Sequence, residues 1–316
     1  MKMKWILLTV ISALLLGGTS AFAAADIQIP PHVQVIEDSA FAGCTGLKSV
    51  SIPSTVRTID TDAFYKCTGL ESLSIANGVE SIGIRAFKGC IKLKSVSIPS
   101  TVDTIDSEAF SGCSGMLSLS IANGVKTISM RAFEKCTGLK SVSIPSTVDT
   151  LDADAFSGCT GLESLFIAKG VETIGMRAFE KCTNLKSVSI PSTVDIISAG
   201  AFAGCTRLQE AAILNGTQEI DMRAFKGCTA LKSIAIPPSV EKIGVEAFSG
   251  CTGLTTVYIG KGVKNIDMRA FDGCNAITVV YFSGTEAEWK SINIQNGNWY
   301  LKNADIEYNR EIPWPS

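Results

Sequence analysis

Residues 136–158 read CTGLKSVSIPSTVDTLDADAFSG, and this stretch decides the fold because close copies of it fill most of the chain. Residues 94–116 and 140–162, for example, agree at 18 of 23 positions. All eleven cysteines lie 23 residues apart, from Cys44 to Cys274, and an Ala-Phe pair stands before each of them. Repetition at a fixed period of this size predicts a solenoid, in which each repeat forms one coil and packs on its neighbours.

Each repeat is expected to contain one short strand, one β-turn and one helical turn. The LKSVSI segment of residues 139–144 alternates apolar and polar side chains, which predicts a strand with one buried face. The β-turn after it takes two alternating forms, IPSTV as at Pro145 and IANGV as at Gly124. The alternating charges described below have the same period and point to a pair of repeats as the unit of duplication. A single helical turn is expected through each AFxxC segment, with a left-handed exit at glycines such as Gly138.

The apolar side chains of one repeat need the next repeat to cover them. Phe, Cys, Leu, Val and Ile recur in fixed columns, and no single repeat is large enough to bury them all. Stacking in register places equivalent side chains about 4.8 Å apart and makes one continuous core beside a parallel sheet. The eleven AFxxC units then predict a rod or shallow arc on the order of 50 Å long.

The consensus CTGLxSVSIPxxVxTIxxxAFxG resembles the leucine-rich repeat of BspA-like bacterial surface proteins, and the resemblance extends from Val33 to Phe282. The segment YFSGTEAEWKSI, residues 281–292, is similar to the terminal cap of that family. The resemblance implies an exported, curved solenoid with a parallel β-sheet on its concave face. It also implies an adhesin or antigen that contacts macromolecules of a host or a neighbouring cell.

The chain begins with the pattern of a secretory signal peptide. Two lysines precede an apolar stretch, residues 5–18, that is short for a membrane span, and the small-x-small sequence Ala-Phe-Ala ends at Ala23. Residues 1–23 are therefore predicted to be removed, with cleavage after Ala25 as a close alternative and an uncleaved anchor as another. No other segment is long and apolar enough to cross a bilayer. The mature chain is expected to be secreted or held at the cell surface.

The mature chain is expected to divide into a repeat solenoid, residues 24–282, and a C-terminal cap and tail, residues 283–316. Thr285 and Glu288 have the spacing of a helical capping box. Such a helix would place a tryptophan over the open end of the core, and we expect Trp289 and Trp299 to have this capping role.

Composition and motifs argue against nucleic-acid binding and catalysis. Without the two signal-peptide lysines the chain carries 26 basic and 30 acidic residues, so it lacks the basic surface that a phosphate backbone requires. His32 is the only histidine, and the sequence gives it no Ser or Cys partner. A glycine-rich phosphate loop and the CxxC and HExxH metal motifs are also missing. We expect no catalytic residue, no metal site and no cofactor.

The cysteines and a column of alternating charges are expected to be structural. The cysteine count is odd and the position is buried, which favours free thiols packed as small apolar groups; a partial disulfide ladder is the alternative. Two residues before each Phe, acidic and basic residues alternate along most of the chain, and Glu108, Asp154 and Glu246 are each predicted to lie between two arginines. A ladder of this length indicates charge pairing between coils, because a catalytic site would be local.

Outward positions on the predicted strands are mostly serine, and the exceptions are the candidate ligand-binding residues. Phe166 is the only outward aromatic residue in the central repeats, and Glu210 is the only charge in its column. Tyr258 and Tyr281 extend an aromatic edge towards the C-terminus. Exposed aromatic side chains contribute much of the binding energy in protein interfaces. Tolerated sequence drift, or packing of the two tyrosines on the cap, is the alternative.

The sequence therefore predicts an adhesin-like binding module without enzymatic activity. Its expected partner is an extracellular or host-surface protein, or a glycan, bound on the concave face of the solenoid. The alternative is a structural or antigenic surface spacer, in which the repeats form a rigid rod without a specific ligand. The sequence does not indicate an oligomeric state.

Overall fold

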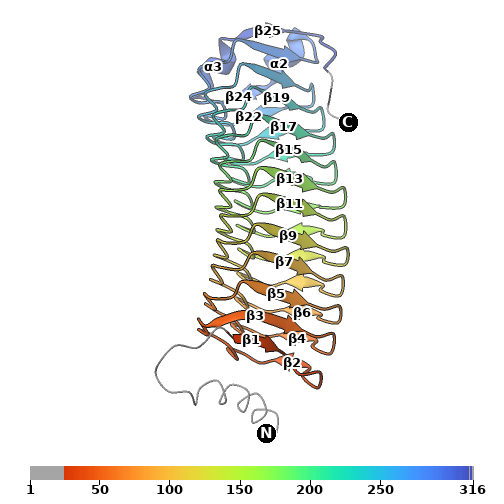
Figure 1. The fold of residues 1–316 in the computed structure, drawn as a ribbon. Helices are drawn as coiled ribbons and strands as arrows, with labels where there is room; N and C mark the ends of the chain where they lie inside the picture. Colours follow the sequence, from red (N-terminus) through yellow and green to blue (C-terminus); the bar gives the residue numbers. More distant parts are fainter. Residues whose placement is uncertain (1–24, 313, 315–316) are drawn as a thin grey trace.

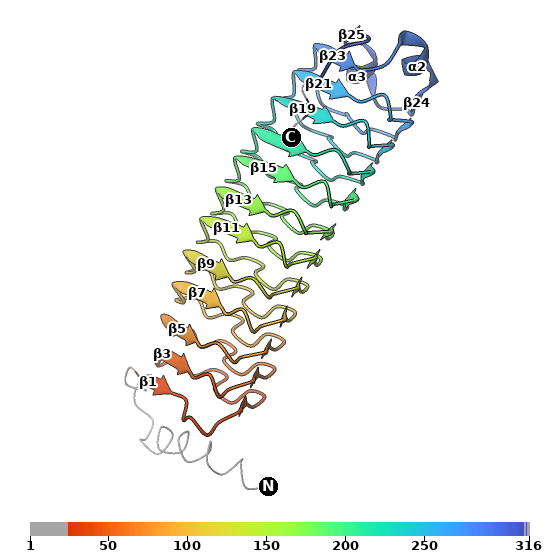
Figure 2. The same ribbon diagram turned by 90° about the vertical axis from the view of Figure 1, so that its right-hand side faces the viewer.

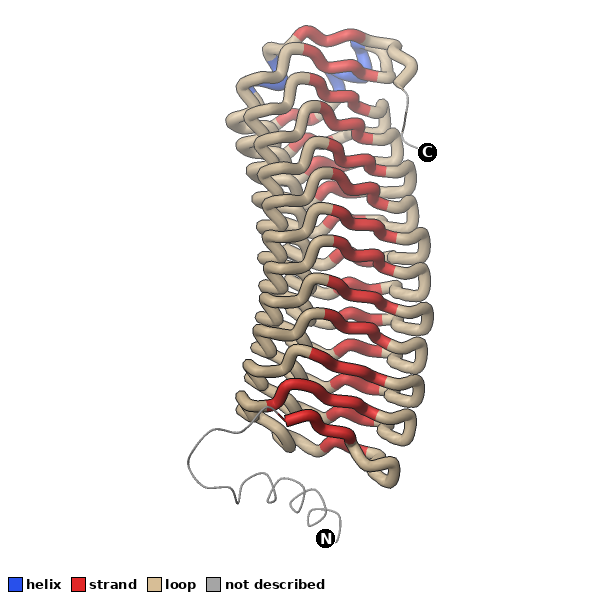
Figure 3. Tube along the Cα trace, viewed as in Figure 1, coloured by secondary structure: helices blue, strands red, loops and turns tan. Residues whose placement is uncertain are grey.

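The computed structural model describes residues 25–312 and Trp314, so the predicted signal peptide, residues 1–23, lies outside the described part of the chain. The described chain forms a β-solenoid, a rod of stacked coils that run from the N-terminal to the C-terminal end (Figure 1). Each coil adds one long strand to one face of the rod and one short strand to a second face behind it (Figure 3). The rod curves only slightly in the side view (Figure 2).

The long strands carry most of the ladder contacts between coils, and their outward side is called the long-strand face below. All pairs of long strands are parallel, and equivalent residues of neighbouring repeats stand opposite each other, as Ser143 does with Phe166. The strands are β1 (Ala25–Gln28), β3 (Leu47–Ile52), β5 (Ser72–Ile75), β7 (Ser95–Ile98), β9 (Ser118–Ile121), β11 (Ser141–Ile144), β13 (Ser164–Ile167), β15 (Ser187–Ile190), β17 (Glu210–Ile213), β19 (Ser233–Ile236), β21 (Thr256–Ile259), β23 (Val279–Phe282) and β25 (Asp305–Glu307).

The short strands form one continuous parallel sheet of twelve strands. Each strand is two residues long, with a buried isoleucine or leucine as its second residue in all but the last. They are β2 (Val35–Ile36), β4 (Thr58–Ile59), β6 (Ser81–Ile82), β8 (Thr104–Ile105), β10 (Thr127–Ile128), β12 (Thr150–Leu151), β14 (Thr173–Ile174), β16 (Ile196–Ile197), β18 (Glu219–Ile220), β20 (Lys242–Ile243), β22 (Asn265–Ile266) and β24 (Asn293–Ile294).

The core between the two sheets is built from columns of identical side chains. The phenylalanine rings from Phe41 to Phe271 form an unbroken stack, with 5.0–5.5 Å between successive ring centroids. All eleven cysteines are free thiols, and all but Cys44 are buried. From Cys67 onwards each thiol donates a hydrogen bond to the carbonyl of the phenylalanine in the preceding coil, as Cys159 does to Phe133 at 3.2 Å. The predicted in-register stacking is therefore confirmed.

The AFxxC segments are not the helical turns that the sequence predicted. The Phe64 N–H donates to the Ala86 carbonyl of the next coil at 2.7 Å, so it is not free to make a helical bond within its own coil. The segment instead makes successive tight turns, in which Asp62 and Lys66 adopt positive φ angles of 54° and 53°. The predicted left-handed exit at Gly138 is also wrong, because Gly138 has no positive φ and the left-handed residues of that turn segment are Arg131 and Lys135.

Proline interrupts the long-strand ladder at three junctions between coils. After β5 the Ala76 N–H donates to the Ile52 carbonyl at 3.0 Å, whereas Pro99, at the equivalent position after β7, has no N–H to offer. Accordingly β5 and β7 are not paired, and neither are β9 and β11 or β13 and β15. These three interruptions are two repeats apart, which is the predicted unit of duplication. By contrast β3 and β19, which also precede a proline, remain paired with the long strand before them.

The two turn types interlock across each interrupted junction. The Thr147 hydroxyl of an IPSTV turn accepts a hydrogen bond from the Gly124 N–H of the preceding coil at 3.0 Å and donates one to the Val125 carbonyl at 2.9 Å. Gly124 has a φ of 130°, and a Cβ there would collide with the Ser100 carbonyl oxygen of the coil before it. An Asn-Gly turn therefore fits between two proline turns.

The C-terminal end of the rod is closed by a small cap with two helices, α2 (Glu286–Ser291) and α3 (Trp299–Lys302). Thr285 and Glu288 form the predicted capping box, and Trp289 packs edge-on against Phe282 at 5.3 Å between centroids. The prediction for Trp299 is wrong, because this side chain is 65% exposed and Leu301 is the buried residue of α3.

Candidate functional site

The long-strand face carries two outward columns of mostly serine side chains, one at the first and one at the third residue of each strand from β5 to β23. Inward residues alternate with them and belong to the core, so this face is flat and polar over most of its length. The serines of the central coils are Ser95, Ser97, Ser118, Ser120, Ser141, Ser143, Ser164, Ser187 and Ser189.

Phe166 interrupts this polar surface in the middle of the rod. It stands in β13 opposite Ser143 of β11, and its side chain is 61% exposed. The burial of its neighbours Leu165 and Ile167 confirms that Phe166 points outwards. It belongs neither to the core nor to either end of the rod, so a packing role within the coil does not account for it.

The other three candidates lie together near the C-terminal end, away from Phe166. Glu210 begins β17 and is exposed, and the rings of Tyr258 and Tyr281 stack at 5.1 Å between centroids. The prediction that Glu210 is the only charge in its column is wrong. Ser49 belongs to the same column, and Asp26 of β1 stands opposite Ser49 in the first coil.

The C-terminal tail covers the two tyrosines, which the sequence did not reveal. The Arg310 guanidinium lies over the Tyr281 ring at 5.5 Å from its centroid. The backbone N–H of Arg310 donates to the Phe282 carbonyl at 3.2 Å. Ile312 is buried beyond it, although it lies outside every repeat. The tyrosines are therefore partly packing residues for the chain's own tail, as the alternative interpretation held.

A groove of about 240 Å³ lies where the tail meets the strands. Its walls are Glu210, Tyr258 and Ile312 together with small side chains at outward positions of β17 and β19, Ala212 and Ala235. These alanines replace the usual outward serines where the tail packs. In the sequence, this contact could have been inferred only from the run of apolar residues at outward strand positions and the apolar residue in the tail.

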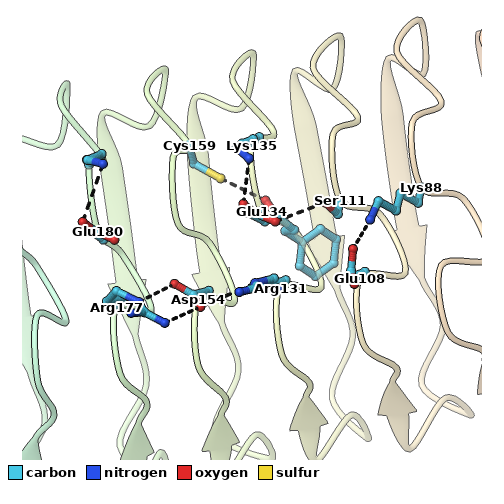
Figure 4. Close-up of polar contacts among 12 residues, drawn as sticks. Lys88, Glu108, Ser111, Arg131, Glu134, Lys135, Asp154, Cys159, Arg177 and Glu180 are labelled. Atoms are coloured by element: carbon cyan, nitrogen blue, oxygen red, sulfur yellow. Dashed lines mark hydrogen bonds and ion pairs between the residues drawn. The ribbon is translucent and has the colours of Figure 1, made fainter.

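The charged column forms ion pairs between coils along one edge of the rod (Figure 4). Asp154 lies between Arg131 and Arg177, as predicted, with its nearest nitrogens at 3.6 and 2.9 Å. The predicted pairs of the other two acidic residues need correction. Glu108 pairs with Lys88, and Glu246 pairs with Lys226 in addition to one arginine, Arg223.

The titration of this column follows from those contacts. Hydrogen bonds from Lys226 and Arg223 lower the pKa of Glu246 to about 2, so it is charged at any physiological pH. Burial raises the pKa of Cys113 to about 12, which keeps that thiol protonated and unreactive.

Within residues 25–312, no three or more His, Cys, Asp and Glu side chains are grouped to hold a metal ion. The helices of the described chain include none that is long and apolar enough to span a membrane.

Comparison with known proteins places this fold in a family. A model of the BspA type leucine-rich repeat region matches residues 19–137, 104–232 and 196–307, which together cover most of the chain. A search of curated proteins gave no match.

Solved structures are similar to this chain at low sequence identity. The pneumococcal vaccine antigen PcpA is 18% identical with a TM-score of 0.54, over 93% of this chain and 90% of that one. A leucine-rich cell surface protein of Faecalibacterium prausnitzii is 27% identical with a TM-score of 0.44, over 86% and 91% of the two chains. A leucine-rich repeat protein of T. pallidum is 29% identical with a TM-score of 0.47, over 58% and 77%.

Proposed function

The chain belongs to the BspA-type leucine-rich-repeat family, and we propose that it is an exported, non-catalytic protein that binds another protein through its long-strand face. In this proposal residues 1–23 are a signal peptide, residues 24–282 are the binding solenoid, and residues 283–316 are its cap and tail. The protein then acts outside the cell or at its surface, as an adhesin-like module.

The exposure of Phe166 is the observation that carries the proposal. A phenylalanine that is 61% exposed on a strand leaves apolar area in water without any gain in packing. The serines beside it keep the surface flat, so a partner can approach the ring from several directions. A single aromatic anchor within a polar surround is the usual arrangement of a binding hot spot.

Glu210 and the tyrosine pair extend the proposed contact surface towards the C-terminal end. Glu210 adds a negative charge at the rim of the groove, and the parts of Tyr258 and Tyr281 left uncovered by the tail add apolar area. Phe166 and Glu210 are two coils apart, which is about 10 Å along the rod, so one protein partner can contact both.

Surface plasmon resonance tests the proposal, with the purified chain passed over immobilised extracellular-matrix proteins and, in parallel, over a glycan array. We expect Phe166→Ser to weaken the response at least about tenfold while the melting temperature stays unchanged, because the side chain is a contact and not a core residue. Trp299→Ser is the matched control, since it removes an equally exposed aromatic side chain from the cap.

Three results would contradict this assignment. Binding that is equal in the Phe166→Ser variant and the unaltered chain would place the contact on another surface. A chain that binds none of the immobilised proteins or glycans would instead favour the rigid spacer without a ligand. Binding to glycans alone would replace the protein partner by a carbohydrate.

A further inference from the structure

A row of exposed apolar side chains runs along the edge of the rod where the short strands meet the AFxxC turns. Its members stand three residues before every second core phenylalanine, and each is 41–45% exposed. In the coils between them the same position holds a smaller side chain that is partly buried. The large residues are Ile84, Met130, Met176, Met222 and Met268, and the smaller ones are Thr61, Ser107, Ala153, Ala199 and Val245. Together they are called the edge row below.

The neighbouring column of charges alternates with the same period of two coils. An arginine follows each large residue of the edge row, and an acidic residue follows each smaller one except Ala199, which precedes Gly200. Side chains of four of the arginines are 42–51% exposed, whereas the acidic side chains are only 9–22% exposed. Coils with a large exposed apolar residue and a positive charge, called protruding below, therefore alternate with coils that have a smaller residue and, except at Gly200, a negative charge, called recessed below.

The edge row lies outside the hydrophobic core of the rod. The core columns are complete without the edge row, and the ion pairs use the arginines but not the methionines before them. Five large apolar side chains, one every second coil, extend over about 38 Å of the rod axis. An apolar row of this length on a polar protein indicates a contact with another molecule.

The period of the edge row identifies that molecule. A partner must offer hollows and negative charges about 10 Å apart, with protrusions and positive charges between them. The recessed coils of this same chain have that spacing. We propose that two copies of the chain associate side by side through their edge rows, in antiparallel orientation.

Symmetry selects the antiparallel arrangement. If two parallel rods are related by a two-fold axis along their length, equal coils stand at equal heights, so large residues meet large residues and arginines meet arginines. An axis perpendicular to the rods, midway between the coils of Ala153 and Met176, instead pairs every protruding coil with a recessed one. The pairs are then Thr61 with Met268, Ile84 with Val245, Ser107 with Met222, Met130 with Ala199, and Ala153 with Met176.

The charges become complementary at the same register. The same axis places Arg85 beside Glu246, Glu108 beside Arg223 and Asp154 beside Arg177 of the second copy. Two columns with independent chemistry thus favour one arrangement. Such an interface is closed by its own two-fold symmetry, so association stops at the dimer.

Sedimentation equilibrium of the purified chain tests the interface. We expect a mass of two chains, and we expect Met176→Asp to weaken association at least about tenfold by placing a carboxylate in the apolar row. Ile91→Asp is the matched control, because Ile91 is an equally exposed apolar residue outside the edge row. Equal melting temperatures of the two variants show that both are folded. A monomer for the unaltered chain, or a dimer that Met176→Asp leaves intact, would overturn the proposal.

A disulfide trap tests the orientation. Thr61 and Met268 are nine coils apart, about 43 Å in one rod, so cysteines at these two positions can join only between copies. We expect the double variant Thr61→Cys, Met268→Cys to form a covalent dimer on mild oxidation, and each single variant to stay uncrosslinked. The ten buried cysteines are shielded, and the single variants also control for half-buried Cys44. Crosslinking of Thr61→Cys alone would show a parallel pair and would overturn the antiparallel arrangement.

Discussion

At the scale of single residues, the charged column combines a backbone penalty with an electrostatic gain. Asp154 and Arg177 have φ angles of 59° and 56°, in the left-handed region that glycine tolerates best. Each such residue costs about 1–2 kcal/mol of backbone strain. Asp154 is largely buried and accepts two hydrogen bonds from Arg177, at 2.9 and 3.1 Å, which offsets that strain. Gly200, in the same column, has neither the strain nor the ion pair.

The phenylalanine stack gives a prediction at the same scale. Phe133 lies between Phe110 and Phe156, with 5.3 and 5.1 Å between the ring centroids, and it is fully buried. Phe133→Ala should lower the free energy of unfolding by about 3–5 kcal/mol, because a cavity replaces the ring. Denaturant unfolding measures this, with Ser118→Ala on the long-strand face as a control expected to have almost no effect. Equal losses for both variants would contradict the assigned inward and outward faces.

At the scale of elements, the two turn types compensate for each other. The proline turn removes a ladder donor, and its threonine or serine hydroxyl then binds the Asn-Gly turn of the preceding coil. The Asn-Gly turn begins with an N–H that donates to the proline coil before it, as Ala122 does to the Ile98 carbonyl, so the ladder continues there. Its glycine packs directly on the backbone of that proline coil. Alternation of the turns is therefore a packing requirement, and the duplication of repeats in pairs follows from it.

Two glycines with different surroundings test this requirement. Gly124→Ala should lower the free energy of unfolding by more than about 3 kcal/mol, because the added methyl group meets the Ser100 carbonyl oxygen. Gly112→Ala should cost only about 1 kcal/mol, since its φ of 74° is unfavourable for alanine but the nearest atom would lie at 3.9 Å. Urea denaturation of both variants measures the difference. A larger loss for Gly112→Ala would contradict the packing role of the Asn-Gly turn.

At the scale of the whole molecule, repetition decided what could be predicted from the sequence. The inward columns and the parallel sheet follow from the period, because many copies report the same constraint. The cap helix occurs once and follows from the local capping-box spacing of Thr285 and Glu288. The turn through Phe64 was mistaken for helix because its N–H binds the next coil, and no single repeat shows that bond. The packing of Ile312 was missed because the tail occurs once, so it has no equivalent to compare. Tyr258 was thus recognised as unusual, but its contact with the tail could not be predicted.

The nearest-neighbour character of the rod leads to a last prediction, on removing whole coils. Deleting residues 94–139 removes one 46-residue pair and joins Leu93 to Lys140. The residues from Lys140 onwards repeat those from Lys94 onwards, so the sequence around the new junction stays the same. Every junction then keeps its proline and Asn-Gly alternation and its alternating charges. Stability should fall only by the contribution of two coils, because each repeat interacts with its neighbours alone.

Deleting residues 94–116 instead removes half a pair and should be more harmful, although fewer residues are lost. It places the Asn-Gly turn of Gly124 directly on that of Gly78 and brings Arg131 next to Arg85. The glycine contacts and the threonine hydrogen bonds at that junction are then lost, and like charges stand in adjacent coils. We expect the 23-residue deletion to unfold at a lower urea concentration than the 46-residue deletion. The opposite order would show that stability depends only on the number of coils, and that the pairing of repeats is a record of duplication without a structural role.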